Sequence, residues 1–139
     1  MAHIGKEFMQ QTRYSHLTPS LQQQGAPPPP AEMSPVPSGR EYTLTQPDPD
    51  DFPSLSFAEL AEQRRSVRRY ADEPLKREEL AYLLWYTQGI QRRAGAGASI
   101  RTVPSAGARH ALETYLLVNT VNDIEPGIYR YRPYTHVLT

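Results

Sequence analysis

Residues 54–90 read SLSFAELAEQRRSVRRYADEPLKREELAYLLWYTQGI, and this stretch decides the fold of the chain. Its first helix is signalled by a capping box, because the Ser56 hydroxyl can accept the amide proton of Glu59 while the Glu59 carboxylate reaches back. That helix is predicted to end at about Gln63 or Arg64. A basic segment comes directly after it, with four arginines and a serine within six residues.

A second helix is predicted from about Arg77 to Gln88, after a loop that Pro74 favours by disfavouring helix at the preceding residue. Its acidic first turn and the glycine after its end match the preferences of helix termini. Positions i, i+3, i+4 and i+7 predict a stripe that faces the core. The stripe consists of Leu80, Leu83, Leu84 and Thr87. Trp85 and Tyr86 flank it, and we expect them to pack in the core or at a subunit contact rather than to stack on a ligand.

The composition argues against several classes of protein. The 139 residues include 15 basic and 15 acidic side chains, so no net charge steers the chain to nucleic acid or to a membrane. Cysteine is absent, which excludes disulfides, thiolate metal sites and a cysteine nucleophile. The four histidines are scattered, so no metal site is expected. No stretch resembles a membrane span or a signal-peptide core, and we expect a cytoplasmic protein.

Residues 1–53 differ sharply in composition from residues 54–139. Ten of the 14 prolines lie at or before Pro53, including the run Pro27–Pro30. A segment with so few aliphatic side chains cannot bury enough surface to fold alone, so we expect a Pro-rich arm, largely extended or disordered. Residues 4–14 can form one short helix in it. A proline-rich ligand for a recognition domain is the alternative interpretation of the arm.

The basic segment Arg64–Arg69 is a candidate phosphate-binding site. A guanidinium group offers a planar fork of donors that matches phosphate oxygens, and a bent backbone can bring Arg65, Ser66 and Arg68 around one phosphate. A solvated basic surface paired with nearby carboxylates is an equally open interpretation. A nucleic-acid interface is a third, but the zero net charge and the lack of a known nucleic-acid-binding motif argue against it.

A second candidate site is the segment PSAGA, residues 104–108. Small side chains let backbone amides and carbonyls approach a flat ligand closely, and glycine permits unusual dihedral angles. An ordinary tight turn is the alternative. The glycine- and alanine-rich segment before it, residues 91–101, is expected to be a loop. Neither segment matches a dinucleotide fingerprint or a Walker A motif, and no nucleophile elbow is present.

The last part of the chain predicts β-structure. Residues 114–118 (TYLLV) form a short apolar run that predicts a buried strand. Residues 127–131 alternate, break at a turn over residues 132–135 and resume at residues 136–138, which predicts a β-hairpin.

Taken in this order, the arginine segment, the amphipathic helix, the small-residue loop and the strands resemble the nitroreductase family. Residues 54–90 resemble its opening, with the signature R-R-S-x-R-x-[YF] and a helix that ends in glycine. Residues 101–118 (RTVPSAGARHALETYLLV) and 124–138 (IEPGIYRYRPYTHVL) are similar to the SagB-type branch, the azoline dehydrogenases. In that branch P-S-A-G-A precedes a strand, and P-G-x-Y-x-Y-x-P-x-x-H-x-L follows it.

The resemblance implies an α+β fold of the nitroreductase type, with an antiparallel or mixed sheet flanked by helices, in an intertwined homodimer with two FMN sites at the subunit interface. It also implies two sets of cofactor-binding residues. The set that would hold the FMN phosphate and ribityl chain is Arg64, Arg65, Ser66 and Arg68. The set that would line the isoalloxazine, typically from the partner subunit, is Pro104, Ser105, Ala106 and Gly107.

The activity implied by the resemblance is two-electron transfer through flavin N5, with the cofactor supplying the redox chemistry. A nicotinamide usually reduces the nitroreductases, whereas azoline dehydrogenases oxidise thiazoline or oxazoline rings in modified peptides. Nitroreductases proper usually place an asparagine shortly after the serine of the loop, and its absence here favours the SagB-type branch. No catalytic residue can be assigned from the sequence.

The family needs roughly as many residues again after Thr139, so we expect the fold to be incomplete in this chain. The further residues normally supply more strands, a long dimer helix and additional flavin contacts. The alternative function is therefore a non-catalytic scaffold or binding protein on this fold, or a truncated fragment without activity of its own. Bound flavin would separate these hypotheses, because an oxidoreductase of this family must hold it.

Overall fold

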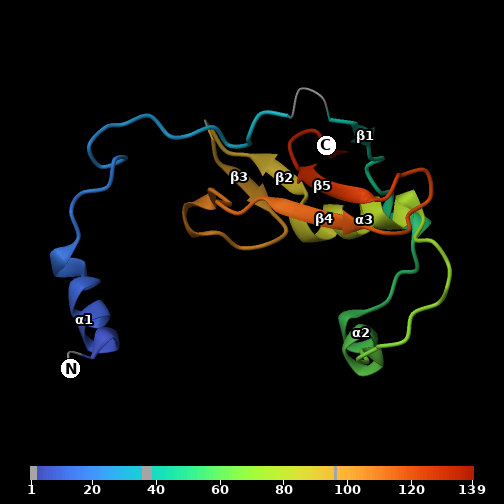
Figure 1. Ribbon diagram of the computed structural model, residues 1–139. Coiled ribbons are helices and arrows are strands. Elements are labelled where there is room, and N and C mark those ends of the chain that lie inside the picture. Colours follow the sequence, from blue (N-terminus) through green and yellow to red (C-terminus); the bar gives the residue numbers. More distant parts are fainter. Residues whose placement is uncertain (1–2, 36–38, 96) are drawn as a thin grey trace.

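A four-stranded antiparallel sheet lies at the centre of the protein (Figure 1). The computed structural model describes residues 3–35, 39–95 and 97–139. The strands lie in the order β1-β6-β5-β4. Their bounds are Tyr42–Thr43 for β1, Thr114–Val118 for β4, Gly127–Arg132 for β5 and Val137–Leu138 for β6. With helices beside this sheet, the predicted α+β class is confirmed.

Helix α3 (Arg77–Gln88) packs on one face of the sheet, and its bounds are those predicted. The predicted stripe is partly wrong. Leu80 and Leu84 are buried, but Leu83 and Thr87 are exposed, and Ala81 takes the place of Leu83 in the core. The small Ala81 side chain suits close packing of a helix against a sheet. At the helix start Lys76 provides no side-chain cap, but its backbone N–H donates to the Glu79 carboxylate at 2.9 Å.

The two faces of the sheet have different environments. Alternate residues of β5 point to opposite faces, so Tyr129 and Tyr131 enter the core beneath α3. On β4 only Val118 is buried, whereas Tyr115 and Leu117 are exposed on the other face. The predicted strand at residues 114–118 is confirmed, but it is an edge strand that is buried on one side only.

The buried phenol of Tyr131 is paired with His136, which lies in the turn between β5 and β6. The Tyr131 hydroxyl lies 2.7 Å from Nδ1 of His136, and Nε2 lies 3.2 Å from the Thr45 carbonyl. A carbonyl only accepts, so Nε2 carries the proton and Nδ1 accepts from the phenol. Trp85 of α3 packs edge-on against the same imidazole, with ring centroids 5.4 Å apart, as its predicted role in packing requires.

A second hairpin replaces the loop that was predicted at residues 91–101. Strands β2 (Ile90–Arg93) and β3 (Ser99–Arg101) pair antiparallel. Gly95 and Gly97 have positive φ angles of 64° and 77°, which glycine adopts without strain, and they lie in the connection between the strands. The sequence prediction failed because this glycine- and alanine-rich connection hides two strands too short to show a period.

Two helices project away from the sheet (Figure 1). Helix α1 (Ile4–Gln11) confirms the short helix predicted in the arm, and α2 (Phe57–Gln63) confirms the helix after the capping box. Both halves of that box are present, because the Ser56 N–H donates to Glu59 at 2.7 Å and the Glu59 N–H donates to the Ser56 hydroxyl at 3.3 Å. No helix in the described ranges has the length and apolar character to cross a membrane.

Three single turns of 3-10 helix complete the secondary structure of the described ranges. They are η1 (Tyr14–His16), η2 (Pro49–Asp51) and η3 (Ala106–Ala108). Part of the arm belongs to the folded unit of the sheet and α3, which we call the body. Strand β1 lies inside residues 1–53, and Leu44 after it is buried in the core. The assignment of residues 1–53 as a separate arm remains a prediction.

The exposure of α3 predicts a contrast between two neighbouring leucines. Leu84→Ala should lower the free energy of unfolding by about 2–5 kcal/mol, because it leaves a cavity between α3 and the sheet. Leu83→Ala removes the same atoms from a side chain that is 51% exposed, and should cost less than about 1 kcal/mol. Urea denaturation of both variants measures the difference. Equal losses would contradict the observed orientation of α3.

The buried imidazole predicts a loss of stability in mild acid. Burial lowers the pKa of His136, and its hydrogen bond to the Thr45 carbonyl only partly opposes this. Below about pH 6.5 the unfolded chain then binds more protons than the folded chain, so stability falls as the pH drops through this value toward the lower pKa of folded His136.

The free energy of unfolding, measured from pH 7.5 to pH 5.5, tests this dependence. His136→Asn should show a shallower fall than the unsubstituted chain, and asparagine tolerates the φ of 54° at this position. An unchanged slope in the variant would show that His136 is not the group responsible.

Candidate cofactor site

The PSAGA loop is built on a strained backbone. Gly107 has φ of 69°, and Ala108 and His110 follow with φ of 53° and 48°. Such angles cost non-glycine residues about 1–3 kcal/mol and persist only where surrounding contacts impose them. Here Ser105 imposes them, because its carbonyl accepts from Ala108 N–H at 3.2 Å and its hydroxyl accepts from His110 N–H at 2.9 Å.

His110 is the titratable side chain at this loop. Its Nε2 lies 3.1 Å from the Ser99 carbonyl and therefore donates, so in the neutral ring Nδ1 is an acceptor. The pKa of His110 is lowered, first by desolvation and then by the nearby Arg101 guanidinium, while the bond to Ser99 opposes the shift. The neutral form is thus favoured at pH 7. Sequence reasoning did not select His110, because a lone histidine after a small-residue loop has no distinguishing pattern.

Two hollows flank the loop, with volumes of about 380 Å³ and 240 Å³. Pro104 and Ser105, both predicted to contact a cofactor, line each of them, and so does His110. Ala106 and Gly107, also predicted, are exposed at the tip of the loop and line neither. A flat ring held by the loop would therefore contact the part of the loop that carries Ser105 and His110. The exposed tip, formed by Ala106 and Gly107, offers a further contact surface.

The predicted phosphate-binding residues follow α2 and are all exposed. Segment 64–70 has no regular secondary structure, and the guanidinium of Arg65 donates to the backbone carbonyl of Glu62 at 3.3 Å. Within residues 3–35, 39–95 and 97–139, Arg64, Arg65 and Arg68 form no ion pair with a carboxylate. Solvated guanidiniums of this kind fit a phosphate-binding segment and a solvated basic surface equally well.

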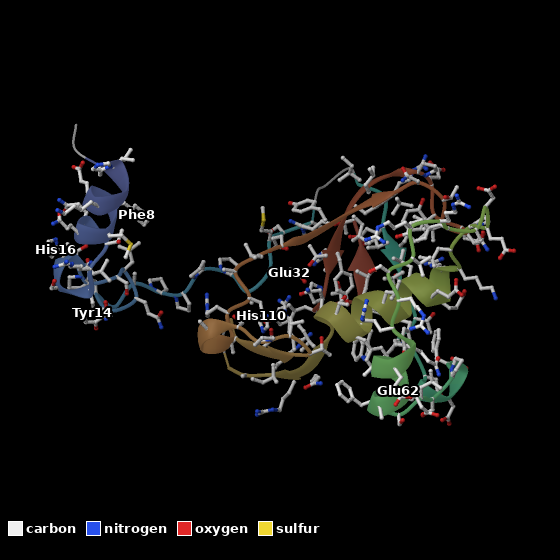
Figure 2. All side chains as sticks on the ribbon, turned by 90° about the horizontal axis from the view of Figure 1, so that it is seen from below. Phe8, Tyr14, His16, Glu32, Glu62 and His110 are labelled. Atoms are coloured by element: carbon white, nitrogen blue, oxygen red, sulfur yellow. The ribbon has the colours of Figure 1, made fainter. Side chains whose placement is uncertain are left out.

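The structure does not bring the two predicted sets together within one chain. In Figure 2 Glu62, at the end of α2, and His110, beside the PSAGA loop, lie at different ends of the body, with α3 between them in this view. Figure 1 likewise shows α2 well apart from the loop that leads into β4. Within one chain, the arginine segment and the PSAGA loop are thus two separate candidate half-sites rather than one closed pocket.

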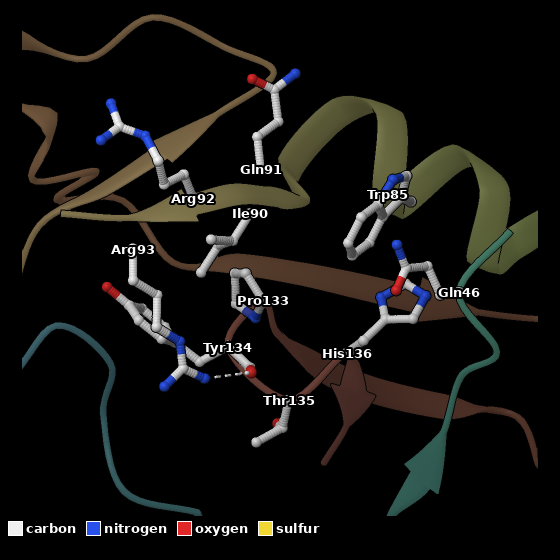
Figure 3. A pocket seen from close by; sticks show the side chains of 10 residues that line it. All are labelled: Gln46, Trp85, Ile90, Gln91, Arg92, Arg93, Pro133, Tyr134, Thr135 and His136. Carbon is white, nitrogen blue, oxygen red and sulfur yellow. Dashed lines mark hydrogen bonds between the residues drawn. The ribbon is translucent and has the colours of Figure 1, made fainter.

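A third hollow of about 320 Å³ lies between α3, β2 and the β5–β6 turn (Figure 3). Trp85 and His136 form one wall, and the Arg93 guanidinium lies over the Tyr134 ring at 5.2 Å on the other side. Both ring nitrogens of His136 are engaged, so it serves as a wall rather than as a ligand. Sequence reasoning missed this hollow because its residues come from three separate segments.

The described residues contain no group of three or more histidine, cysteine, aspartate or glutamate side chains that could hold a metal ion. The donors at the two half-sites are guanidiniums, hydroxyls, an imidazole and backbone groups. This chemistry suits an organic anion with a flat ring better than a metal.

A sequence model described as the nitroreductase family matches residues 61–138, which is more than half of the chain. The chain therefore belongs to the nitroreductase family. It is 37% identical over 86 residues to a protein of Methanocaldococcus jannaschii, and it is 30% identical to a protein from Ralstonia eutropha JMP134 whose crystal structure it matches with a TM-score of 0.56. Both relatives carry the description "putative nitroreductase".

The chain spans less than half the length of these relatives. The matched region covers 62% of this chain and 41% of the Methanocaldococcus protein, and 76% of this chain and 45% of the Ralstonia protein. The match to a solved nitroreductase-type structure confirms the predicted fold and that it is a partial domain. Members of this family generally bind a flavin.

Proposed function

We propose that this chain supplies the first part of an FMN-dependent oxidoreductase of the nitroreductase family. The observation behind this proposal is the pair of half-sites, namely exposed guanidiniums without carboxylate partners after α2 and a strained small-residue loop before β4. They occur in the order of the family's phosphate-binding and ring-binding motifs. Neither half-site contributes a side chain to the hydrophobic core of the described residues, so core packing does not explain its composition.

The residues present fit FMN. Arg65, Ser66 and Arg68 would hold the phosphate and ribityl chain through charge-assisted hydrogen bonds, with Arg64 as an additional cation. The loop would present backbone groups of Ala106 and Gly107, together with the Pro104 and Ser105 side chains, to the isoalloxazine. When bound, the flavin supplies two-electron chemistry at N5, and the protein contributes orientation and electrostatics.

The separation of the half-sites supports a site shared between two copies of the chain. In this arrangement the arginine segment of one protomer and the PSAGA loop of its partner hold the same flavin, so a homodimer contains two sites. Exposed apolar residues on the open face of the sheet, Tyr115, Leu117 and Ile128, offer surface for association.

For the reaction we propose the SagB-type oxidation of an azoline-like ring in a peptide, with nicotinamide-dependent reduction as the alternative chemistry of the family. Support comes from the loop, which lacks the asparagine of nitroreductases proper, and from the resemblance of residues 126–138 to the hairpin motif of the SagB-type branch. In that hairpin Tyr129, Tyr131 and His136 are buried, so its repeated tyrosines and histidine serve the stability of the fold. No residue is assigned as a catalytic acid or base.

Visible absorption of the purified protein, with mass identification of any released cofactor, tests the proposal. An FMN spectrum supports an oxidoreductase site completed by this chain. A colourless protein that also fails to take up added FMN would overturn the proposed cofactor binding and favour a non-catalytic scaffold on the same fold.

Arginine substitutions test the phosphate assignment. Arg68→Ala should weaken FMN binding about tenfold or more, because it removes a charge-assisted hydrogen bond, and should leave the free energy of unfolding unchanged, because Arg68 is exposed. Arg69→Ala is the matched control and should have little effect. Equal FMN affinity of the two variants, measured by fluorescence titration, would contradict the role of Arg68.

A further inference from the structure

One short part of the arm is fastened to the sheet. Residues 29–34, which we call the strap, lie against the face of β5 opposite α3, where Arg130 and Arg132 alternate with the core tyrosines. Figure 2 shows Glu32 where the arm meets the body, far from α1. At the strap the arm is therefore held by specific contacts.

The strap is held by charge-assisted contacts that are largely shielded from water. Glu32 accepts from Arg132 at 3.0 Å and from the backbone N–H of Tyr134 at 3.2 Å, and the two charged side chains are only 11% and 16% exposed. Arg130 donates to the carbonyls of Met33 at 3.2 Å and Ser34 at 2.7 Å. Arg132 also lies 3.6 Å from the Glu41 carboxylate, but the Glu41 side chain is 54% exposed, so Glu32 is the shielded partner and its contacts are costly to break.

The same strap also contacts the PSAGA loop through Arg109. This side chain extends from the end of the loop and donates to the Pro29 carbonyl at 3.1 Å. The connection between β2 and β3 leaves room for it at Gly97, where a Cβ atom would lie 2.7 Å from Nη1 of Arg109. Arg109 therefore lies between the strap and the β2–β3 hairpin, one residue before His110, and its hydrogen bond to Pro29 is exposed to solvent.

We propose that the strap is a positioning element of the cofactor loop, in which Glu32 anchors the strap and Arg109 transmits that anchoring to residues 104–110. This inference rests on the proposed function of the loop. The loop needs an external constraint, because the left-handed backbone at Ala108 and His110 is unfavourable by itself. Ser105 supplies a constraint from inside the loop, and Arg109 supplies one from outside.

Neither Glu32 nor Arg109 touches the proposed flavin position, so both are positioning residues. The strap connects β5 to the PSAGA loop through hydrogen bonds and an ion pair. Substitutions along such a connection change the coupling free energy between the connected parts by about 0.5–2 kcal/mol. A strap that merely covers the sheet would behave differently. Releasing it would then change the arm and β5 but leave the loop as it was.

Hydrogen exchange of the full-length, flavin-free protein tests the proposal through the backbone amides of residues 105–110. Glu32→Gln should speed exchange in both the strap and the loop, by about threefold to tenfold in the loop. Arg109→Gln should speed exchange in the loop alone, because Glu32 still holds the strap. Glu78→Gln on the exposed side of α3 and Arg92→Gln on β2 are matched controls and should change neither region.

Loop exchange at the rate of the unsubstituted chain in Arg109→Gln would overturn the proposal, as would a Glu32→Gln variant with a released strap and an unchanged loop. If Glu32→Gln also exposes the amides of α3, the fold itself is lost and Arg109→Gln decides. FMN titration is a separate measurement, in which both variants should bind about threefold to tenfold more weakly than the unsubstituted chain. Failure of the unsubstituted chain to bind FMN would overturn the proposed function and leave the exchange result valid.

Discussion

A phenol without contact to water sets the arrangement of the body. Tyr131 is fully buried, and its hydroxyl must find a partner there because an unpaired buried polar group costs about 1–3 kcal/mol. That partner is His136, whose other nitrogen donates to the Thr45 carbonyl just after β1. One chain of two hydrogen bonds thus joins β5, the turn before β6 and the end of the arm, and α3 closes over it with Trp85. Burial raises the pKa of Tyr131, so the phenol stays protonated and keeps its role as donor.

Local signals predicted the elements that local physics determines. The capping box fixed the start of α2, and Pro74 together with Gly89 bounded α3, because these effects act within one helical turn. The β2–β3 hairpin and the exposure of Leu83 were not predictable in this way. The strands of the hairpin are too short to show a period, whereas the exposure of Leu83 depends on the surface that the sheet presents, which is formed by residues far away in the chain.

The candidate site shows the same division. The arginine segment and the PSAGA loop were recognisable as motifs, and the structure shows an exposed cationic segment and a strained loop at those positions. Their separation within one chain, the orientation of His110 toward Ser99 and the strap contact to Arg109 have no local sequence signal. These features arise from contacts between residues far apart in the chain. Such contacts leave no periodic pattern in the sequence from which they could be predicted.

The strap contacts join residues that are 80 to 102 positions apart, and this separation has a consequence for the order of folding. Contacts between such distant residues require the closure of a long loop and form after local ones. During synthesis, at about 5–20 residues per second, the strap waits several seconds for β5 and the PSAGA loop to emerge. A proline-rich segment with few aliphatic residues suits this interval, because it offers little for a nascent chain to misfold around. The composition of the arm thus suits a segment that is made before β5 and the PSAGA loop and docks only after they have emerged.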